Sequence, residues 1–308
     1  MHLDPAGGGP FRTLLAVLLA ALLGLTACGQ AERGPEPVVV GVGSHPEQLV
    51  LGAIVTASLR SAGIDVEVLD GLGDTVALRR QAGAGQIDLY VDYTGAAWGL
   101  GLGEQAPPAD PEESFARVAE ADAAQGLRWL PPSRTNATFA LAVRSEAVPE
   151  DTDPTMSWLA GQLSGSAATI CAERDFLLRD GGLDALAGEY GIDLGEVRRE
   201  EAIEAAAVAG VADGTCDAGL VIATSGLAQE AGLTVVADDL GVMPAFVIAP
   251  VVRAGSAGAQ EEVAAALAPV MQALDTPTLA RLNAEHAAGQ QPSALAERYL
   301  AEVLGTAG

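Results

Sequence analysis

A strict alternation of strand and helix patterns is the feature that most limits what this chain can fold into. Residues 38–43, 64–70 and 87–93 read as strands. Between them, residues 48–62 and 74–83 have helical patterns. The order strand, helix, strand, helix, strand predicts an α/β fold with a parallel, doubly wound sheet and right-handed crossovers.

The third of these strands ends in an aromatic ring and a hydroxyl group. Apolar and polar residues alternate as far as Asp92, and Tyr93, Thr94 and Gly95 follow, where the glycine breaks the pattern. Because open α/β sheets bind ligands at the carboxyl ends of their strands, Tyr93 and Thr94 are candidate ligand contacts. A tyrosine near a strand end is more often a packing residue, so the pattern alone leaves both interpretations open.

A second set of strands and helices follows the first and suggests a second lobe. Its strands are expected near 167–171, 196–199, 217–222 and 234–236, and its helices near 182–190 and 202–213. The polar segment 145–155 suits a first crossing between the lobes, and the strand 246–253 suits the return. We therefore predict lobe I as residues 38–144 and 246–308 and lobe II as residues 145–245, with a ligand cleft between them.

The rest of lobe I lies on either side of lobe II in the sequence. A proline-containing loop leads to a helix expected at about 112–125, and a strand is expected at 138–144. Alanine-rich segments predict helices at 258–274 and 276–304. The chain beyond its leader has about 280 residues, which is large for one core and also favours two lobes.

The amino-terminal residues read as an export signal. Arg12 precedes an apolar run at 14–23, which is shorter than the roughly 20 residues that a membrane span needs. The sequence LTAC that ends at Cys28 resembles a bacterial lipobox, and a plain signal peptide with an incidental cysteine is the alternative. We predict a signal peptide at 1–27, lipid on Cys28 and a tether at 28–37, which would hold the protein outside the cytoplasm on the cell membrane.

The net charge argues against a nucleic-acid partner. The chain has 41 acidic residues and 16 basic residues, and its formal charge is −25 at pH 7. Nucleic-acid binding rests on neutralising phosphates with basic side chains, which this balance does not provide. The charge is instead expected to keep an exported monomer soluble.

Two cysteines remain after Cys28. In an oxidising compartment Cys171 and Cys216 could form a disulfide, because each adjoins an apolar run that reads as a strand; two buried thiols are the alternative. A metal site is disfavoured, because neither His45 nor His286 is near either cysteine in the sequence. We predict no metal and no cofactor.

Motifs of catalysis are missing from the sequence. Ser44 and His45 are adjacent, but neighbours in an extended segment point in opposite directions and cannot pair as nucleophile and base. The sequence has no zinc-protease, nucleophile-elbow or phosphate-loop motif. We therefore predict a binding protein rather than an enzyme.

Aromatic residues are scarce, which gives their positions weight. They make up 4% of the chain. Tyr93 follows one expected strand, Phe139 begins another, and Phe246 begins a third. Rings that converge from different strands can enclose a quaternary ammonium group, which has no N–H donor and is held by ring faces that contribute roughly 0.5–2 kcal/mol each.

Six blocks along the chain match one protein family in order. The blocks are VGVGSHPEQLVLGAI, GQIDLYVDYTGAA, RTNATFALAVR, DFLLRDGGLDALAGEYG, CDAGLVIATSG and MPAFVIAPVVR. From about Val38 to Val303, the sequence resembles the substrate-binding lipoproteins of ABC importers for glycine betaine, carnitine and choline. The resemblance implies a type II periplasmic-binding-protein-like fold, with two doubly wound lobes and two crossings. It also implies a small-molecule solute as ligand and the transmembrane permease subunits of an ABC importer as partners.

The resemblance implies an aromatic cage around the trimethylammonium group of the ligand. Tyr93, Phe139 and Phe246 fall on cage positions. Ile222 falls on a fourth position, where the family usually has tyrosine. The loss of one ring should weaken binding by about 1 kcal/mol, which leaves binding in place.

The family's polar positions are matched less fully. Arg179 matches an arginine that clamps the ligand carboxylate, and a surface ion pair with Asp175 or Asp180 is the alternative. His45 stands where lysine is common, with an ordinary loop residue as the alternative, and Ala96 replaces a threonine. The predicted set of ligand-binding residues is completed by Ser44, Thr94 and Asn136.

These departures bear on the choice of ligand. We predict a quaternary ammonium osmolyte of the choline or glycine betaine type, and a weakened carboxylate clamp favours choline. A different small polar metabolite on the same fold is the alternative. An enzyme on this fold is disfavoured: hydroxymethylbilane synthase, which shares the two-lobed architecture, handles polyanions with many arginines, whereas acidic residues outnumber arginines by 41 to 16 in this chain.

Overall fold

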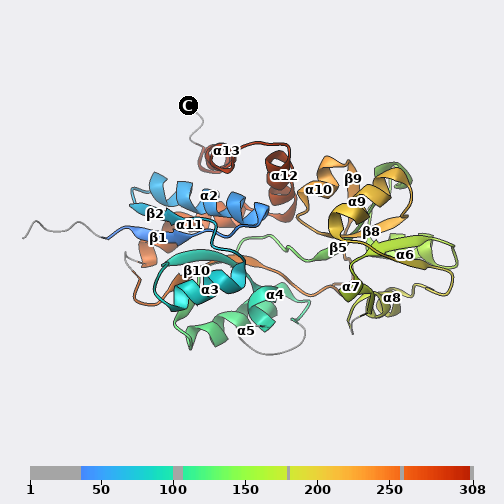
Figure 1. Ribbon diagram of the computed structural model, residues 1–308, viewed down its shortest axis with the longest axis horizontal. Coiled ribbons are helices and arrows are strands. Elements are labelled where there is room, and N and C mark those ends of the chain that lie inside the picture. The colour runs from blue at the N-terminus through green and yellow to red at the C-terminus, as the bar shows by residue number, and fades with distance from the viewer. Residues whose placement is uncertain (1–35, 100–106, 179–180, 257–259, 306–308) are drawn as a thin grey trace, which may run out of the picture. The chain divides into compact units, whose positions relative to one another are not determined.

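Two five-stranded β-sheets with their helices make up the described part of the protein. The computed structural model describes residues 36–99, 107–178, 181–256 and 260–305 (Figure 1). The chain divides after Glu36, and both sheets belong to the unit Pro37–Gly308. Cys28 and Arg179 lie outside the described residues.

The first sheet has the strand order β2-β1-β3-β10-β4. Its strands are β1 (Val38–Gly41), β2 (Val66–Leu69), β3 (Leu89–Tyr93), β4 (Leu127–Trp129) and β10 (Ile248–Arg253). β1 is parallel to β2 and β3, as the alternation of strands and helices predicted. β10 runs antiparallel to β3 and β4, so the sheet is mixed.

Helices pack on both faces of the first sheet. They are α2 (Pro46–Ser61), α3 (Thr75–Gly83), α4 (Thr94–Ala97), α5 (Pro111–Ala123), α11 (Gln260–Ala273), α12 (Thr276–Ala287) and α13 (Pro292–Leu304). Figure 1 shows α2, α12 and α13 on one side of the strands and α3, α4 and α5 on the other. The first group buries residues such as Ile54 and Leu282, and the second buries Trp98 and Val118.

The polar positions of β3 face protein rather than water. Asp88 and Asp92 are both buried. Asp88 pairs with Arg253 at 2.6 Å, and Asp92 pairs with Arg79 at 3.2 Å. Burial raises the pKa of Asp92 to about 6, although Arg79 acts in the opposite direction. Both faces of the strand are therefore buried: Leu89 and Val91 lie in one apolar core and Tyr90 lies in the other, and the carboxylates are paired with arginines because a buried carboxylate needs a partner.

The second sheet has the strand order β7-β6-β8-β5-β9. Its strands are β5 (Phe139–Arg144), β6 (Thr169–Ala172), β7 (Arg198–Glu201), β8 (Ala218–Ile222) and β9 (Leu233–Val236). Its helices are α6 (Met156–Leu163), α7 (Arg174–Leu178), α8 (Leu183–Tyr190), α9 (Glu204–Asp213) and α10 (Gly226–Glu230), with a 3₁₀ turn η3 (Ser145–Ala147). β6 is parallel to β7 and β8, whereas β5 is antiparallel to β8 and β9.

The strand β5 belongs to the second sheet, whereas the sequence suggested the first lobe. We assigned residues 38–144 to the first lobe, but β5 pairs with β8 and β9 of the second sheet. The first crossing therefore lies before Phe139 and not at 145–155. An apolar strand pattern does not say which sheet a strand joins, because that choice depends on partners distant in the sequence.

The carboxyl-terminal helical segment is broken where the sequence analysis predicted one helix at 276–304. α12 ends at Ala287 and α13 begins at Pro292. Gly289 has a backbone φ of +98°, which is outside the helical region. Pro292 has no N–H group to continue a preceding helix but suits the first position of a new one.

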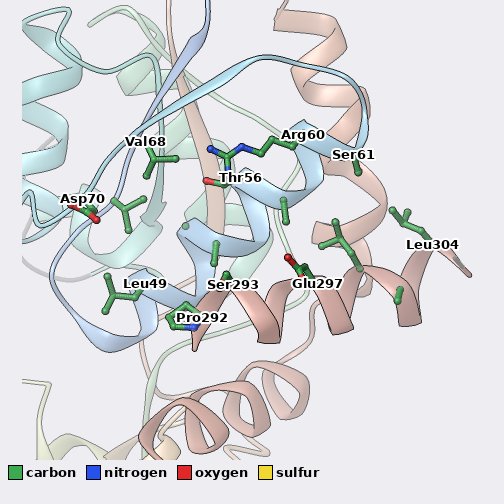
Figure 2. A pocket seen from close by; sticks show the side chains of 16 residues that line it. Leu49, Thr56, Arg60, Ser61, Val68, Asp70, Pro292, Ser293, Glu297 and Leu304 are labelled. Atoms are coloured by element: carbon green, nitrogen blue, oxygen red, sulfur yellow. The ribbon is translucent and has the colours of Figure 1, made fainter. Parts of the chain in front are cut away.

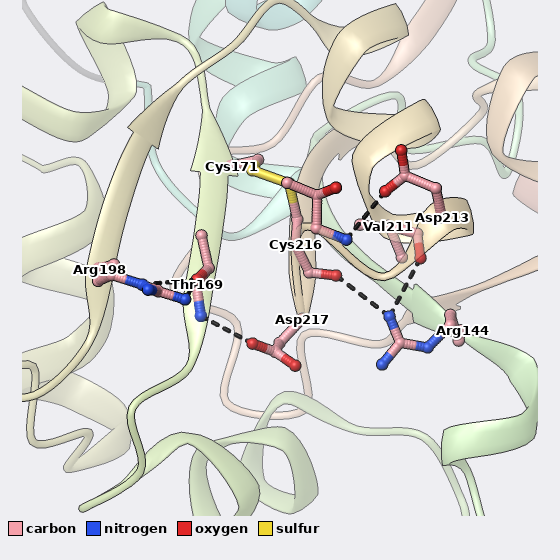
Figure 3. Close-up of a disulfide and its surroundings, with 9 residues drawn as sticks. Arg144, Thr169, Cys171, Arg198, Val211, Asp213, Cys216 and Asp217 are labelled. Atoms are coloured by element: carbon pink, nitrogen blue, oxygen red, sulfur yellow. Dashed lines mark hydrogen bonds between the residues drawn. A yellow bond between two sulfur atoms is a disulfide. The ribbon is translucent and has the colours of Figure 1, made fainter.

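A disulfide joins Cys171 and Cys216 at the second sheet (Figure 3). Cys171 lies in β6, and Cys216 lies just before β8, the parallel neighbour of β6. Both side chains are buried beside Ala207 and Val211 of α9. The helix can approach this closely because a Cβ atom at Gly210 would lie 2.5 Å from the Cys216 sulfur.

Candidate functional site

A cavity of about 280 Å³ is lined by residues from both sheets. The lining consists of His45, Glu47, Gln48, Asp74, Thr75, Tyr93, Ala96, Ala137, Phe139, Ile222 and Phe246. Tyr93 ends β3 and Phe246 precedes β10 of the first sheet, whereas Phe139 of β5 and Ile222 of β8 belong to the second. The four residues that the sequence analysis placed around a trimethylammonium group thus face one hollow.

Tyr93 is fixed at this cavity through its backbone and its hydroxyl group. Its backbone pairs with Ile248 of β10, and its amide donates a 2.8 Å hydrogen bond to Asp92 Oδ1. The hydroxyl donates a 2.7 Å hydrogen bond to Glu47 Oε1. Burial, and then the Glu47 charge, raise the pKa of Tyr93 well above its ordinary value, so the phenol stays neutral. The aromatic ring can therefore line the cavity while its polar end is satisfied.

Phe246 is held by contacts with two segments distant in the sequence. Its amide donates to Asn136 Oδ1 at 2.7 Å, and its carbonyl accepts from the Ala137 amide at 2.9 Å. Its ring packs directly over Gly95, where an added Cβ atom would lie 2.5 Å from ring carbons. The glycine that ends the pattern of β3 therefore leaves room for an aromatic wall of the cavity.

Phe139 and Ile222 come from neighbouring strands of the second sheet. They are directly opposite each other in the antiparallel pair of β5 and β8, so their side chains share one face. The Phe139 ring lies 5.9 Å from the Phe246 ring, with the planes at 76°, and 6.1 Å from the ring of Phe176 in α7. An edge-to-face contact thus joins Phe139 of the second sheet to Phe246, which stands just before β10 of the first sheet.

Four polar residues of the lining, Glu47, Gln48, Asp74 and Thr75, were missed by the sequence analysis. Glu47 and Gln48 stand in the first turn of α2, and Asp74 is the N-cap of α3. Gln48 Oε1 is buried and has no hydrogen-bond partner among the described residues. This oxygen packs against Gly43, where an added Cβ atom would lie 1.7 Å from it. Glu47 and Gln48 stand in the first of the six blocks that match the family, and this position could have marked them as candidate ligand contacts. The prediction named Ser44 and His45 from that block instead.

Three predicted ligand contacts support the cavity but do not line it. Thr94 is buried and bonds through its hydroxyl to the Ala245 carbonyl and the Val247 amide, at 3.1 and 3.0 Å. Asn136 bonds to the amide of Phe246, as described above, and Ser44 Oγ accepts from the Gly73 amide at 3.2 Å. In this structure each of these side chains is hydrogen-bonded to backbone, and their contact with a ligand stays a prediction. His45 is exposed at the rim of the cavity.

The sequence matches a family model along most of its length. The model of the substrate binding domain of ABC-type glycine betaine transport systems matches residues 36–302. The chain belongs to this family. Because the family consists of solute-binding domains, this substrate-binding domain is a solute receptor and not an enzyme.

Curated relatives and solved structures agree with this membership. The glycine-betaine-binding protein of Pseudomonas aeruginosa is 32% identical over 299 residues, which cover 94% of each chain. The glycine betaine-binding protein YehZ of Escherichia coli is 29% identical over 297 residues, covering 93% of this chain and 97% of YehZ. The structure of apo YehZ has a TM-score of 0.79 and covers 87% of this chain and 98% of its own.

A second solved structure supports the fold alone. The crystal structure of a glycine betaine/carnitine/choline ABC transporter protein is 20% identical, with a TM-score of 0.74, and covers 86% of this chain and 98% of its own. Together with the two mixed sheets, these likenesses confirm the predicted type II periplasmic-binding-protein-like fold.

A larger hollow of this substrate-binding domain lies on another surface (Figure 2). It has a volume of about 640 Å³ and is bounded by α2, β2 and α13, with Thr56, Arg60 and Glu297 among its lining residues. Among the described residues that line it, none is aromatic and none comes from the second sheet. The smaller cavity is therefore the better candidate for a solute that both halves of the protein would contact.

The described part of this substrate-binding domain offers neither a membrane span nor a metal cluster. Among its described helices, none combines the length and the apolar character that crossing a bilayer requires. Among its described side chains, no three potential metal ligands from histidine, cysteine, aspartate and glutamate lie together.

Proposed function

We propose that the protein binds a quaternary ammonium solute in the 280 Å³ cavity and delivers it to the transmembrane subunits of an ABC importer. The observation that carries this proposal is the convergence of Tyr93, Phe139 and Phe246 on one hollow, with rings supplied by both sheets. A trimethylammonium group offers no N–H donor, and ring faces attract it with roughly 0.5–2 kcal/mol each. Ile222 adds apolar contact where a fourth ring is common in the family.

We further infer that binding closes the two halves of the protein on the solute. Tyr93 and Phe246 belong to the first sheet, and Phe139 and Ile222 to the second. A cation bound among these side chains would contact both halves and so favour the closed arrangement over the open one. The permease would then recognise that closed arrangement.

The polar lining supports two types of ligand. Gln48 is among the lining residues, and its side-chain amide suits a ligand hydroxyl group such as that of choline. His45 stands at the rim, where a ligand carboxylate could reach it. The relatives from Pseudomonas aeruginosa and Escherichia coli are glycine betaine-binding proteins, which supports testing betaine beside choline.

Calorimetry on the unit that begins at Pro37 tests the proposal directly. We expect saturable binding of at least one compound among choline, glycine betaine, carnitine and proline betaine, because all present a quaternary nitrogen to the rings. Flat titrations with all four would overturn the assignment. Mass spectrometry of solute carried through purification would then identify the different polar metabolite that the cavity holds.

We also propose that Cys28, which lies outside the described residues, carries a lipid that anchors the protein to the cell membrane. The LTAC sequence before a polar tether supports this proposal. We expect Cys28→Ala to move the protein from the membrane fraction into the soluble extracytoplasmic fraction. An unchanged membrane fraction would show that something other than this cysteine holds the protein there.

A further inference from the structure

A buried carboxylate forms part of the wall beside the tyrosine ring. The Glu47 residue is only 8% exposed and lines the cavity. Oε1 accepts the hydrogen bond from the Tyr93 hydroxyl at 2.7 Å, and Oε2 accepts from Asn283 Nδ2 at 2.7 Å. Asn283 Nδ2 also donates to the Thr224 carbonyl at 2.9 Å. Two neutral donors therefore hold the carboxylate in place, and among the described residues no basic side chain forms an ion pair with it.

The lining of the cavity is acidic overall. Among its described residues, Glu47 and Asp74 are acidic, and His45 is the one basic residue. Asp74 is exposed and caps α3 by accepting from the Ala77 amide at 2.9 Å. Water screens Asp74, whereas the surroundings of Glu47 are largely protein. Glu47 is therefore the lining charge that a bound solute would feel most strongly.

We propose that Glu47 selects solutes by charge: it favours a quaternary ammonium compound with a net positive charge over a zwitterion. This inference rests on the proposed function, because it assumes that the cationic group lies against the Tyr93 ring. A cation over that ring and the carboxylate bonded to its hydroxyl attract each other. The carboxylate of a zwitterion in the same small cavity would be repelled by Glu47 and would offset this gain.

The expected effect is large enough to measure. A cation within about 6 Å of the ring centroid lies roughly 7 Å from a carboxylate that is hydrogen-bonded to the ring hydroxyl. At that distance, and with an effective dielectric constant of about 20, the attraction exceeds a factor of ten in affinity before screening. We therefore expect a net effect of about tenfold.

The substitution Glu47→Gln removes the charge and can keep both hydrogen bonds. The glutamine carbonyl can accept from Asn283, and its amide can donate to the Tyr93 hydroxyl, which is able to act as an acceptor. Binding is measured by calorimetry for choline and for 3,3-dimethyl-1-butanol, in which carbon replaces the charged nitrogen, with competition detected by NMR if heats are small. The readout is the ratio of the two dissociation constants, which isolates the charge of the ligand from its shape.

We expect Glu47→Gln to lower the preference for choline over the neutral analogue about tenfold. The preference for choline over glycine betaine should fall as well, because the repulsion of the betaine carboxylate is gone. Asp74→Asn is the matched charge control: it removes an exposed charge from the same lining, keeps a residue suited to the N-cap, and should change the ratio less than about threefold.

Asn283→Ala is the matched structural control. It disturbs the same hydrogen-bonded group without changing a charge, so its ratio of choline to neutral analogue should stay at the wild-type value. Equal weakening of both ligands in Glu47→Gln, or the same change of ratio in Asn283→Ala, would overturn charge selection while leaving the proposed function intact. Wild-type protein that binds neither choline nor glycine betaine would overturn both.

Discussion

Replacing Tyr93 with alanine is expected to weaken binding of a quaternary ammonium solute by about 3 kcal/mol, which is more than a hundredfold in affinity. The change removes one ring face, which contributes roughly 0.5–2 kcal/mol. It also removes the hydroxyl that donates to Glu47 at 2.7 Å. Loss of a hydrogen-bond donor to a buried carboxylate costs about 1–3 kcal/mol. The Glu47 side chain would then no longer be held in place at the cavity. Calorimetry with the ligand found for the wild-type protein measures the loss.

Two tyrosine variants separate the ring from the hydroxyl group and from general loss of stability. Tyr93→Phe keeps the ring face and should lose about tenfold in affinity or less. Tyr299→Phe removes another buried hydroxyl, which donates to the Val270 carbonyl at 2.7 Å. Neither Tyr299 nor Val270 lines the cavity. This substitution should leave binding unchanged. If Tyr93→Ala keeps wild-type affinity, the solute does not bind against this ring.

The sequence predicted the walls of the cavity better than their supports. Tyr93, Phe139 and Phe246 could be singled out because aromatic residues are rare and these three adjoin strand ends. Tyr93 ends the parallel strand β3, as the rule for open sheets predicts. Phe246 and Phe139 stand at the starts of β10 and β5, which run antiparallel to β3 and β8, so these starts lie beside the carboxyl ends of the parallel strands. The few aromatic residues therefore predicted the lining of the cavity better than any catalytic or polar motif did.

The supports could not be predicted because their partners are distant in the sequence. Thr94 bonds to Ala245 and Val247, about 150 residues away, and nothing local distinguishes it from a ligand-binding hydroxyl. Asn136 is likewise used by the amide of Phe246. Glu47 reads as an ordinary acidic residue in the first turn of a helix, a favoured place for one. Tertiary contacts decide which polar side chains remain available to a solute.

The sheet that β5 joins could not be predicted for the same reason. Residues 138–144 were predicted as a strand, and β5 occupies Phe139–Arg144. Its sheet, however, is set by pairing with β8 and β9, strands that follow it by more than 70 residues. This placement has a functional consequence, because it brings Phe139 to the cavity from the second sheet. If all the rings came from one sheet, a bound cation would not contact the other sheet and would not stabilise a closed arrangement of the two.

Removing the disulfide with Cys171→Ala and Cys216→Ala together is expected to lower the free energy of unfolding by about 4 kcal/mol at 25 °C. The bridged residues are separated by 45 positions, so the bond excludes many conformations of the unfolded chain. The two sulfur atoms are also buried with Ala207 and Val211, and their loss leaves a small cavity. Chemical unfolding followed by circular dichroism measures the change in unfolding free energy.

Reduction of the wild-type protein is the control that separates the bond from the cavity left by the alanines. Reductant should destabilise the wild-type protein nearly as much as the double substitution does, and it should have no effect on the variant. Neither cysteine lines the candidate site, so solute affinity below the unfolding transition should change less than about twofold. Equal stability of the variant and the oxidised wild-type protein would contradict the role given to the bond. A loss of affinity in a stable variant would instead connect the bond to the site through β6, which leads into α7, where Phe176 packs against Phe139.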